Sequence, residues 1–303
     1  LLPGNLTDLI SQSSVIGGAG AYLNPFMNGD RPYTFIEIFS QLAWGFGYCG
    51  MPHVLVRFMA VKNEKELKKS WAIAIVWDLL SLSAAFAIAV IGRAYLLPVI
   101  LGENGAASSE SVFIEMIRKV FTSELALPFI GGLFLCGILA AIMSTADSQL
   151  LVTASAVSED LYHSFIKKDA DTEEILKVSR ITVIVIAVIA FAIAWNPDSS
   201  IMGLVSNAWA GLGSAFGPIV VMSLFWRRTN LPGAIAGMVT GGLTVIIWDY
   251  IPLVGGQTLG TYTGLYSLAV GFLLSLVMIV IVSLVTKAPS KEITDEFDRV
   301  AAK

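Results

Sequence analysis

Residues 41–57 read QLAWGFGYCGMPHVLVR and lie inside an apolar run from about residue 35 to residue 59. That run is long enough to cross a bilayer, for which about 20 residues suffice. Its centre carries three glycines and a proline within eight residues: Gly45, Gly47, Gly50 and Pro52. Glycine removes backbone stiffness and proline removes an amide donor, so the pattern predicts a membrane helix broken near its middle.

A broken membrane helix has two interpretations. Freed backbone groups at membrane depth need partners in protein or in a watery cavity, and in secondary transporters such breaks mark the substrate site. The alternative is a proline kink that serves packing alone. Trp44 and Tyr48 lie four residues apart, on one face of a helix, and they favour a binding site.

Composition places the whole chain in the membrane. Its 303 residues have a mean hydropathy of +0.75, with 55% hydrophobic and 14% charged residues. Cys49 and Cys136 stand in apolar segments without disulfide or metal spacing, which indicates small packing residues. His53 and His163 lack a catalytic partner spacing, so we do not expect an enzyme. The chain begins without methionine, and we expect it to be incomplete.

The hydrophobic pattern predicts an all-α integral membrane protein with about seven transmembrane helices. The expected spans are residues 33–58 (the broken one), 70–98, 125–165, 180–195, 200–225, 232–251 and 262–286. Residues 1–32 are expected to form a loop with short helical pieces, and residues 99–123 to include a short amphipathic helix. Asp78 falls inside the second span, where a helix-bonding role and a place in a wet vestibule both stay open.

Basic residues set the expected orientation. Fifteen of the 19 Lys and Arg residues fall on alternate loops: Arg57, Lys62, Lys65, Lys68, Lys69, Lys167, Lys168, Lys177, Arg180, Arg227, Arg228, Lys287, Lys291, Arg299 and Lys303. Cytoplasmic loops carry such an excess, so these loops and the C-terminus are expected in the cytoplasm and residue 1 outside.

A second polar stretch interrupts the third long segment, where residues 137–151 read GILAAIMSTADSQLL. A hard monovalent cation such as sodium needs oxygen ligands. The hydroxyls of Ser144 and Thr145 and the carbonyl of Ala141, one turn earlier, can supply three on one side of the helix. Equally open is a structural role, in which the hydroxyls bond back to their own helix and Asp147 caps or pairs with a neighbour.

At these stretches the chain resembles a known family. The motifs WGFGYCGMP (residues 44–52), AIMSTADSQLLV (141–152), SEDLYHSF (158–165) and SLFWRRTNLPGAIAG (223–237) resemble the sodium/solute symporter family. Further stretches, NPFMNGDRPYTFIEIFSQLAWGFGY, GLVSNAWAGLGSAFGP and KAPS, look like its proline-carrying members. The resemblance covers nearly the whole chain, with several motifs in the right order.

The resemblance implies a leucine-transporter-like fold of two five-helix inverted repeats. Residues 1–32 would be an extracellular loop, 33–226 the second repeat, 227–286 two peripheral C-terminal helices and 287–303 a cytoplasmic tail. The first helices of the family are missing from this pattern, so we expect that the chain alone would not transport.

The resemblance also implies function and site residues. It implies sodium-coupled import of L-proline across the cytoplasmic membrane, with sodium co-transported and the lipid bilayer as surroundings. Trp44, Tyr48 and Pro52 match positions of the proline site, and Ala141, Ser144 and Thr145 match positions of the sodium site. Two alternatives stay open: another cargo such as pantothenate, and a non-transporting membrane sensor, although a sensor usually has a longer signalling domain.

Overall fold

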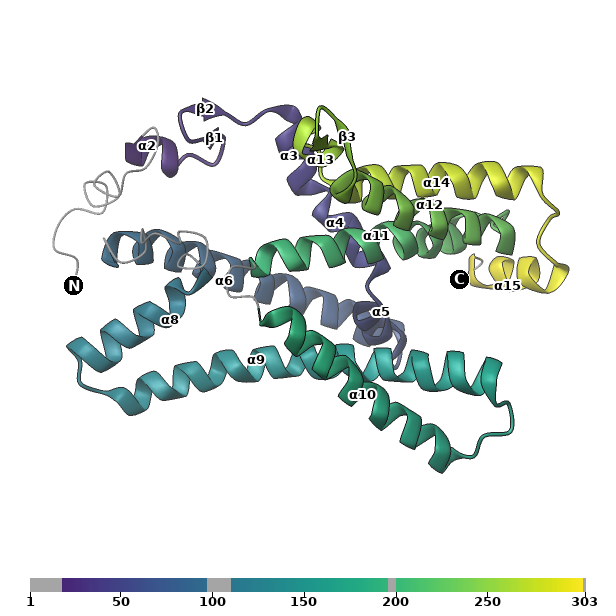
Figure 1. The fold of residues 1–303 in the computed structure, drawn as a ribbon, viewed down its shortest axis with the longest axis horizontal. Helices are drawn as coiled ribbons and strands as arrows, with labels where there is room; N and C mark the ends of the chain where they lie inside the picture. Colours follow the sequence, from purple (N-terminus) through teal and green to yellow (C-terminus); the bar gives the residue numbers. More distant parts are fainter. Residues whose placement is uncertain (1–17, 97–109, 196–199, 302–303) are drawn as a thin grey trace. The chain divides into compact units, whose positions relative to one another are not determined.

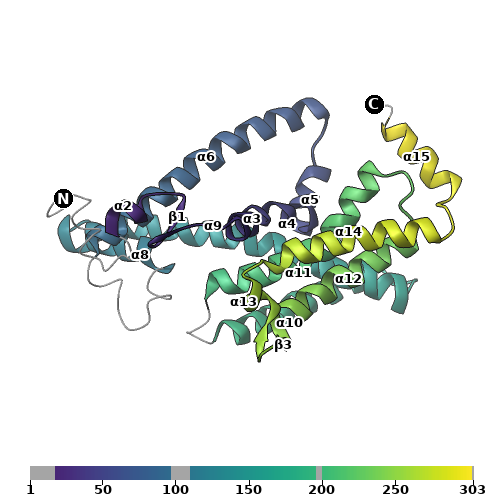
Figure 2. The same cartoon turned by 90° about the horizontal axis from the view of Figure 1, so that it is seen from above.

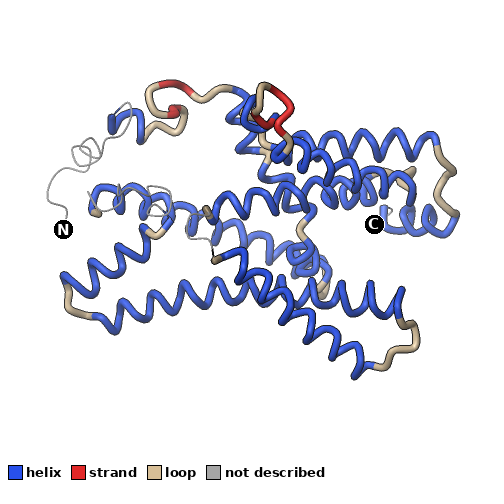
Figure 3. The backbone as a smooth tube through the Cα atoms, viewed as in Figure 1, coloured by secondary structure: helices blue, strands red, loops and turns tan. Residues whose placement is uncertain are grey.

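The structure is a computed structural model that describes residues 18–96, 110–195 and 200–301. It is almost entirely helical, as expected (Figure 3). The described residues also form two small hairpins that the sequence did not predict. One pairs β1 (Met27–Asn28) with β2 (Arg31–Pro32), and the other pairs β3 (Pro252–Val254) with β4 (Gln257–Thr258).

Six described helices are long and apolar enough to cross a membrane. They are α6 (Glu64–Tyr95), α9 (Pro128–Ser155) with its π-helical continuation η4 (Ala156–Ile166), α10 (Thr172–Ala194), α11 (Ile201–Phe225), α12 (Leu231–Tyr250) and α14 (Ser267–Val285). The seventh expected span is the broken one. The multi-pass membrane class is therefore confirmed.

The break expected in residues 33–58 is present. The segment consists of α3 (Phe35–Leu42), α4 (Trp44–Gly47), the 3-10 turn η1 (Tyr48–Gly50) and α5 (Pro52–Met59). Between η1 and α5 the backbone at Met51 is extended, with φ −87° and ψ 111°. Proline is well suited to the first position of a helix because its missing amide proton has no partner there. Pro52 therefore both ends one piece and begins the next.

The chain divides into two compact units. The first unit comprises residues 1–31 and 61–201. It holds α2 (Gly18–Tyr22), α6, α8 (Val112–Ile117), the π-helical turn η3 (Arg118–Glu124), α9, η4 and α10. The short amphipathic helix expected within residues 99–123 is thus α8 with η3; residues 97–109 lie outside the described part.

Two helices of the first unit begin earlier than expected. Helix α6 begins at Glu64 rather than residue 70, and α10 begins at Thr172 rather than residue 180. Their first turns were expected as loop because they are charged. Asn63 and Asp171 cap these turns, and acidic side chains are favourable at a helix N-terminus.

The second unit comprises residues 32–60 and 202–303, with the broken segment, most of α11, and α12, α13 (Leu259–Thr263), α14 and α15 (Lys291–Ala301). Helices α12 and α14 lie side by side in both views (Figures 1 and 2). A Cβ added to Gly233 of α12 would collide with Ser283 of α14, and one added to Gly237 would collide with Ile279 of α14. Small residues four apart allow such backbone approach between membrane helices.

Helix α15 was expected only as a tail. Ile293, Phe297 and Val300 recur along it at helical spacing and give it one apolar face. A bidentate ion pair joins Arg227, which follows α11, to Asp298 of α15. The Arg227 Nε donates to Oδ1 and its Nη2 donates to Oδ2, each at 2.7 Å. Neither residue lies in a spanning helix. The ion pair therefore holds α15 to the segment that follows α11, outside the spanning helices.

Candidate functional site

The broken segment presents an aromatic cluster formed with α11. The ring of Trp44 stacks on Trp209, with centroids 5.6 Å apart and planes 16° apart. Tyr48 meets the same indole edge-on, with centroids 4.9 Å apart. Both geometries are the preferred ones for aromatic pairs. The structure therefore brings two of the three expected substrate residues onto one partner.

Hydrogen bonds hold this aromatic cluster together in addition to the ring contacts. The indole Nε1 of Trp209 donates a hydrogen bond of 3.0 Å to the backbone carbonyl of Trp44. Trp44 also stacks on Tyr266, the residue before α14, with centroids 5.9 Å apart. The Tyr266 hydroxyl donates to the carbonyl of Ser206 on α11 at 2.7 Å. Each partner of Trp44 is thus oriented by a hydrogen bond of its own.

Two glycines of the broken segment have a packing role. A Cβ added to Gly47 would collide with the indole of Trp209. A Cβ added to Gly50 would lie 2.6 Å from the carbonyl oxygen of Leu212, in the backbone of α11. Gly45, in contrast, has nothing within 4 Å. Close approach to α11 therefore requires glycine at two of the three positions.

Pro52 lies on the other side of the extended residue Met51 and is partly buried. Pro52 comes after the turn that begins at Tyr48 and starts α5. It therefore contributes to the break and is not part of the aromatic cluster. Tyr48 itself keeps 52% of its surface exposed. About half of Tyr48 is therefore not covered by the chain next to the cluster.

The expected sodium residues lie on α9. The hydroxyl of Thr145 donates to the carbonyl of Ala141 at 3.4 Å, so the back-bonded arrangement is the one present. Two oxygens at right angles around an ion, each about 2.4 Å from it as for hard cations, also lie about 3.4 Å apart. The pair is therefore spaced for an ion as well as for a weak hydrogen bond.

The third expected ligand is Ser144. Its hydroxyl makes no hydrogen bond within the described part of the chain, while its carbonyl accepts from the hydroxyl of Ser148 at 2.9 Å. Ala141, Ser144 and Thr145 are all exposed in the first unit. Asp147 is exposed too, and among the described residues it forms no ion pair, so the pairing role considered for it is not seen.

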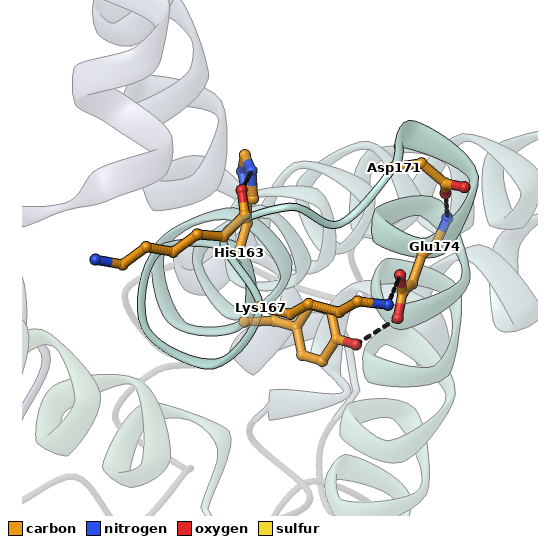
Figure 4. Close-up of polar contacts among 6 residues, drawn as sticks. His163, Lys167, Asp171 and Glu174 are labelled. Atoms are coloured by element: carbon orange, nitrogen blue, oxygen red, sulfur yellow. Dashed lines mark hydrogen bonds and ion pairs between the residues drawn. The ribbon is translucent and has the colours of Figure 1, made fainter.

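The far end of α9 holds a polar network that sequence reasoning missed (Figure 4). The carboxylate of Glu174 accepts from the Tyr162 hydroxyl and from the Lys167 ammonium, each at 2.6 Å. Its backbone amide donates to Asp171 at 2.7 Å. Hydrogen bonding to Glu174 raises the pKa of Lys167, which lies just beyond the span. These bonds join the end of η4 to the first turn of α10.

His163 completes this end of the helix. Its Nδ1 lies 3.3 Å from Glu159 and its Nε2 lies 3.1 Å from the carbonyl of Lys168 (Figure 4). Both neighbours accept hydrogen bonds, so the imidazole links the helix to the loop that follows it. The spacing of four between Glu159 and His163 within SEDLYHSF was the signal available in the sequence.

Trp209 and Tyr266 were also missed as members of the candidate site. Trp209 stands in the family-like stretch GLVSNAWAGLGSAFGP, but a lone tryptophan in an apolar helix does not reveal its partner. Tyr266 precedes a helix that was expected to be peripheral. Both rings also pack against a core of Ala210, Val245 and Leu268, which ties the aromatic cluster to the centre of the second unit.

Known proteins are similar to this chain over most of its length. Residues 10–241 match the model of the sodium:solute symporter family. The osmoregulated proline transporter OpuE of Bacillus subtilis is 46% identical over 258 residues, which cover 85% of this chain and 50% of that protein. The sodium/proline symporter of Escherichia coli is 41% identical over 266 residues, covering 87% and 50%.

The high-affinity proline transporter PutP of Bacillus subtilis is 41% identical over 267 residues, covering 88% of this chain and 53% of that protein. The chain thus spans about half the length of the curated relatives it matches. No solved structure matches it. With a family match over most of its length, the chain belongs to the sodium:solute symporter family.

Proposed function

We propose that this chain forms the second repeat and the last two spans of a symporter that imports L-proline with sodium across the cell membrane. The observation that carries the proposal is the convergence of Trp44 and Tyr48 on Trp209 at a break in a membrane helix. The relatives are named for proline transport, and two of the names in this group include sodium. Together these favour proline as cargo.

The aromatic cluster suits a compact zwitterion with an apolar ring. The exposed face of Tyr48 offers a π surface on which a secondary ammonium is attracted electrostatically. The pyrrolidine ring of proline gains from apolar contact with the same side chains, as in small-molecule sites generally. Pro52 borders this surface by ending the turn that begins at Tyr48. We assign Trp44, Tyr48 and Pro52 to the substrate.

Residues Ala141, Ser144 and Thr145 of α9 form the sodium site of this proposal. Thr145 and Ala141 present oxygens at a spacing that fits one ion, and the Ser144 hydroxyl has no competing bond among the described residues. Coupling requires that each ligand raise the affinity for the other by the same factor. The membrane potential then adds about 2.3 kcal/mol per charge per 100 mV to the inward drive.

The basic loops support a cytoplasmic C-terminus in this proposal. Arg227 and Arg228 follow α11, and Lys287 follows α14, so both ends fall on one side of the membrane. The domain division at residues 33–226 and 227–286, and an inverted-repeat core, are part of the same proposal.

A cargo panel tests the proposal in the intact transporter. Membrane vesicles with an inward sodium gradient take up labelled proline while unlabelled proline, pantothenate or glucose compete. We expect only proline to compete. Competition by pantothenate alone would assign another cargo, and the absence of any sodium-dependent uptake across the panel would refute symport.

A further inference from the structure

A cavity of about 340 Å³ borders Trp44 in the second unit. Its lining comes from the broken segment, α11, α12, α13 and the start of α14. The lining includes the side chains of Ser40, Gln41, Trp44, Ser206, Asp249 and Ser267. Because α12 follows Arg228 and α14 precedes Lys287, the cavity lies at the end of these helices opposite the basic loops.

Among the residues that the structure describes, Asp249 is the one charged side chain that lines this cavity. Its Oδ2 accepts a hydrogen bond of 2.5 Å from the hydroxyl of Ser267. No Lys, Arg or His of the described part of the chain pairs with it. A partly buried carboxylate with a single neutral donor is poorly compensated, and a cation supplies what is missing.

Most of the hydroxyl protons around the cavity are used within the protein. Tyr266 donates to the carbonyl of Ser206, and Ser40 donates to the carbonyl of Gly264 at 3.3 Å. The Ser40 oxygen also accepts from the backbone amide of Tyr266 at 3.1 Å. The carbonyl of Gly264 keeps a second lone pair, and the hydroxyl of Ser206 makes no hydrogen bond among the described residues. Beside the N–H groups of Gln41 and Trp44, the cavity therefore offers oxygen lone pairs and one negative charge, which disfavours anions and suits a small cation.

We propose that this cavity binds a monovalent cation, with Asp249 as the anionic ligand and neutral oxygens of Ser206, Gly264 and Ser267 around it. Sodium is the cation that the chemistry favours, because the carboxylate and the neutral acceptors named here are hard oxygens. The site is separate from the hydroxyl set on α9, which belongs to other residues in the first unit. It adds a second cation site to the chain. This proposal does not depend on which solute is transported.

The test counts bound sodium on the intact purified transporter. Equilibrium binding of radioactive sodium is measured for the wild type, for Asp249→Asn and for Asp295→Asn. Asp249→Asn keeps the shape of the side chain and an acceptor for Ser267 but removes the negative charge. Asp295 lies on α15, away from the cavity, and serves as the matched control. We expect Asp249→Asn to lose one bound sodium per protein at saturation, and Asp295→Asn to lose none.

Further measurements separate this site from its alternatives. Thr145→Ala should weaken a different sodium, so the double variant Asp249→Asn with Thr145→Ala should lose both. Unchanged sodium binding in Asp249→Asn overturns the proposal. If that variant instead unfolds at a lower temperature with sodium binding intact, Asp249 only ties α12 to α14. Loss of proline binding with an unchanged sodium count would give the cavity to the solute and also overturn it.

Discussion

The indole nitrogen of Trp209 donates to the backbone carbonyl of Trp44, and the two rings stack at 5.6 Å. Trp44 lies on the broken helix and Trp209 on α11. The Trp209 side chain thus both bonds the backbone near the break and stacks on the Trp44 ring, which we propose meets the substrate. This explains how irregular backbone persists in an apolar segment, since its polar groups are satisfied by protein.

The hydrogen bond from Trp209 can be removed without removing the stack. Trp209→Phe keeps an aromatic ring and loses the donor, worth about 1 kcal/mol. We expect the KM for proline to rise about fivefold, which corresponds to that free energy, with kcat little changed. Uptake kinetics check this. An unchanged KM would show that the bond does not position Trp44.

Gly47 and Gly45 form a matched pair for testing the close approach to α11. Gly47→Ala places a methyl group into the indole of Trp209, and overpacking of this kind costs about 1–3 kcal/mol. Gly45→Ala meets nothing within 4 Å and should be neutral or slightly stabilising. Thermal unfolding in detergent measures both. Equal unfolding temperatures for the two variants would contradict the packing described here.

Thr145 is tested against another threonine of the same helix. Thr145→Ala removes one proposed sodium oxygen and should weaken sodium affinity tenfold or more, since bonds to charged groups are worth about 1.5–3 kcal/mol. Thr145→Ser should restore it. Thr153 bonds the carbonyl of Gln149 at 2.8 Å in the same manner, and Thr153→Ala should leave sodium affinity unchanged. Equal losses in the two alanine variants would mean that the hydroxyls serve only the helix.

The ion pair of α15 predicts a pH-dependent docking. The hydrogen bond from Arg227 lowers the pKa of Asp298 below its ordinary value. A carboxyl whose pKa is lowered in the folded state adds stability above its ordinary pKa, near 4. That contribution disappears as the pH falls through the lowered value.

Proteolysis of the C-terminal segment provides the measurement for this docking. We expect α15 to be protected at pH 7 and to become cleavable in strong acid or at high salt, which screens exposed charges. Asp298→Asn should be cleavable already at pH 7, and Asp295→Asn should behave as the wild type. Protection of Asp298→Asn equal to that of the wild type would show that the apolar face alone holds α15.

Much of the fold follows from local sequence. Glycines and proline placed the break at residues 45–52, and the apolar runs located each long helix. Charged first turns concealed the starts of α6 and α10, because composition alone does not distinguish a capped helix end from a loop. Helix α15 was missed because its apolar face has only Ile293, Phe297 and Val300.

Only part of the candidate site could be predicted from the sequence. Trp44 and Tyr48 were found because they share a face near a break, which is a local pattern. Trp209 and Tyr266 lie more than 150 residues away, and their contacts depend on how α11 and α14 pack. Gly47 was interpreted as a source of flexibility, whereas the structure shows that it leaves room for an indole.

The most direct test of the central claim is accumulation of labelled proline in proteoliposomes that contain the intact transporter. An inward sodium gradient is compared with an equal potassium gradient. The account predicts that proline rises above its external concentration only with sodium, and that a negative internal potential increases the accumulation. Proline that equilibrates equally under both gradients would contradict sodium-coupled symport.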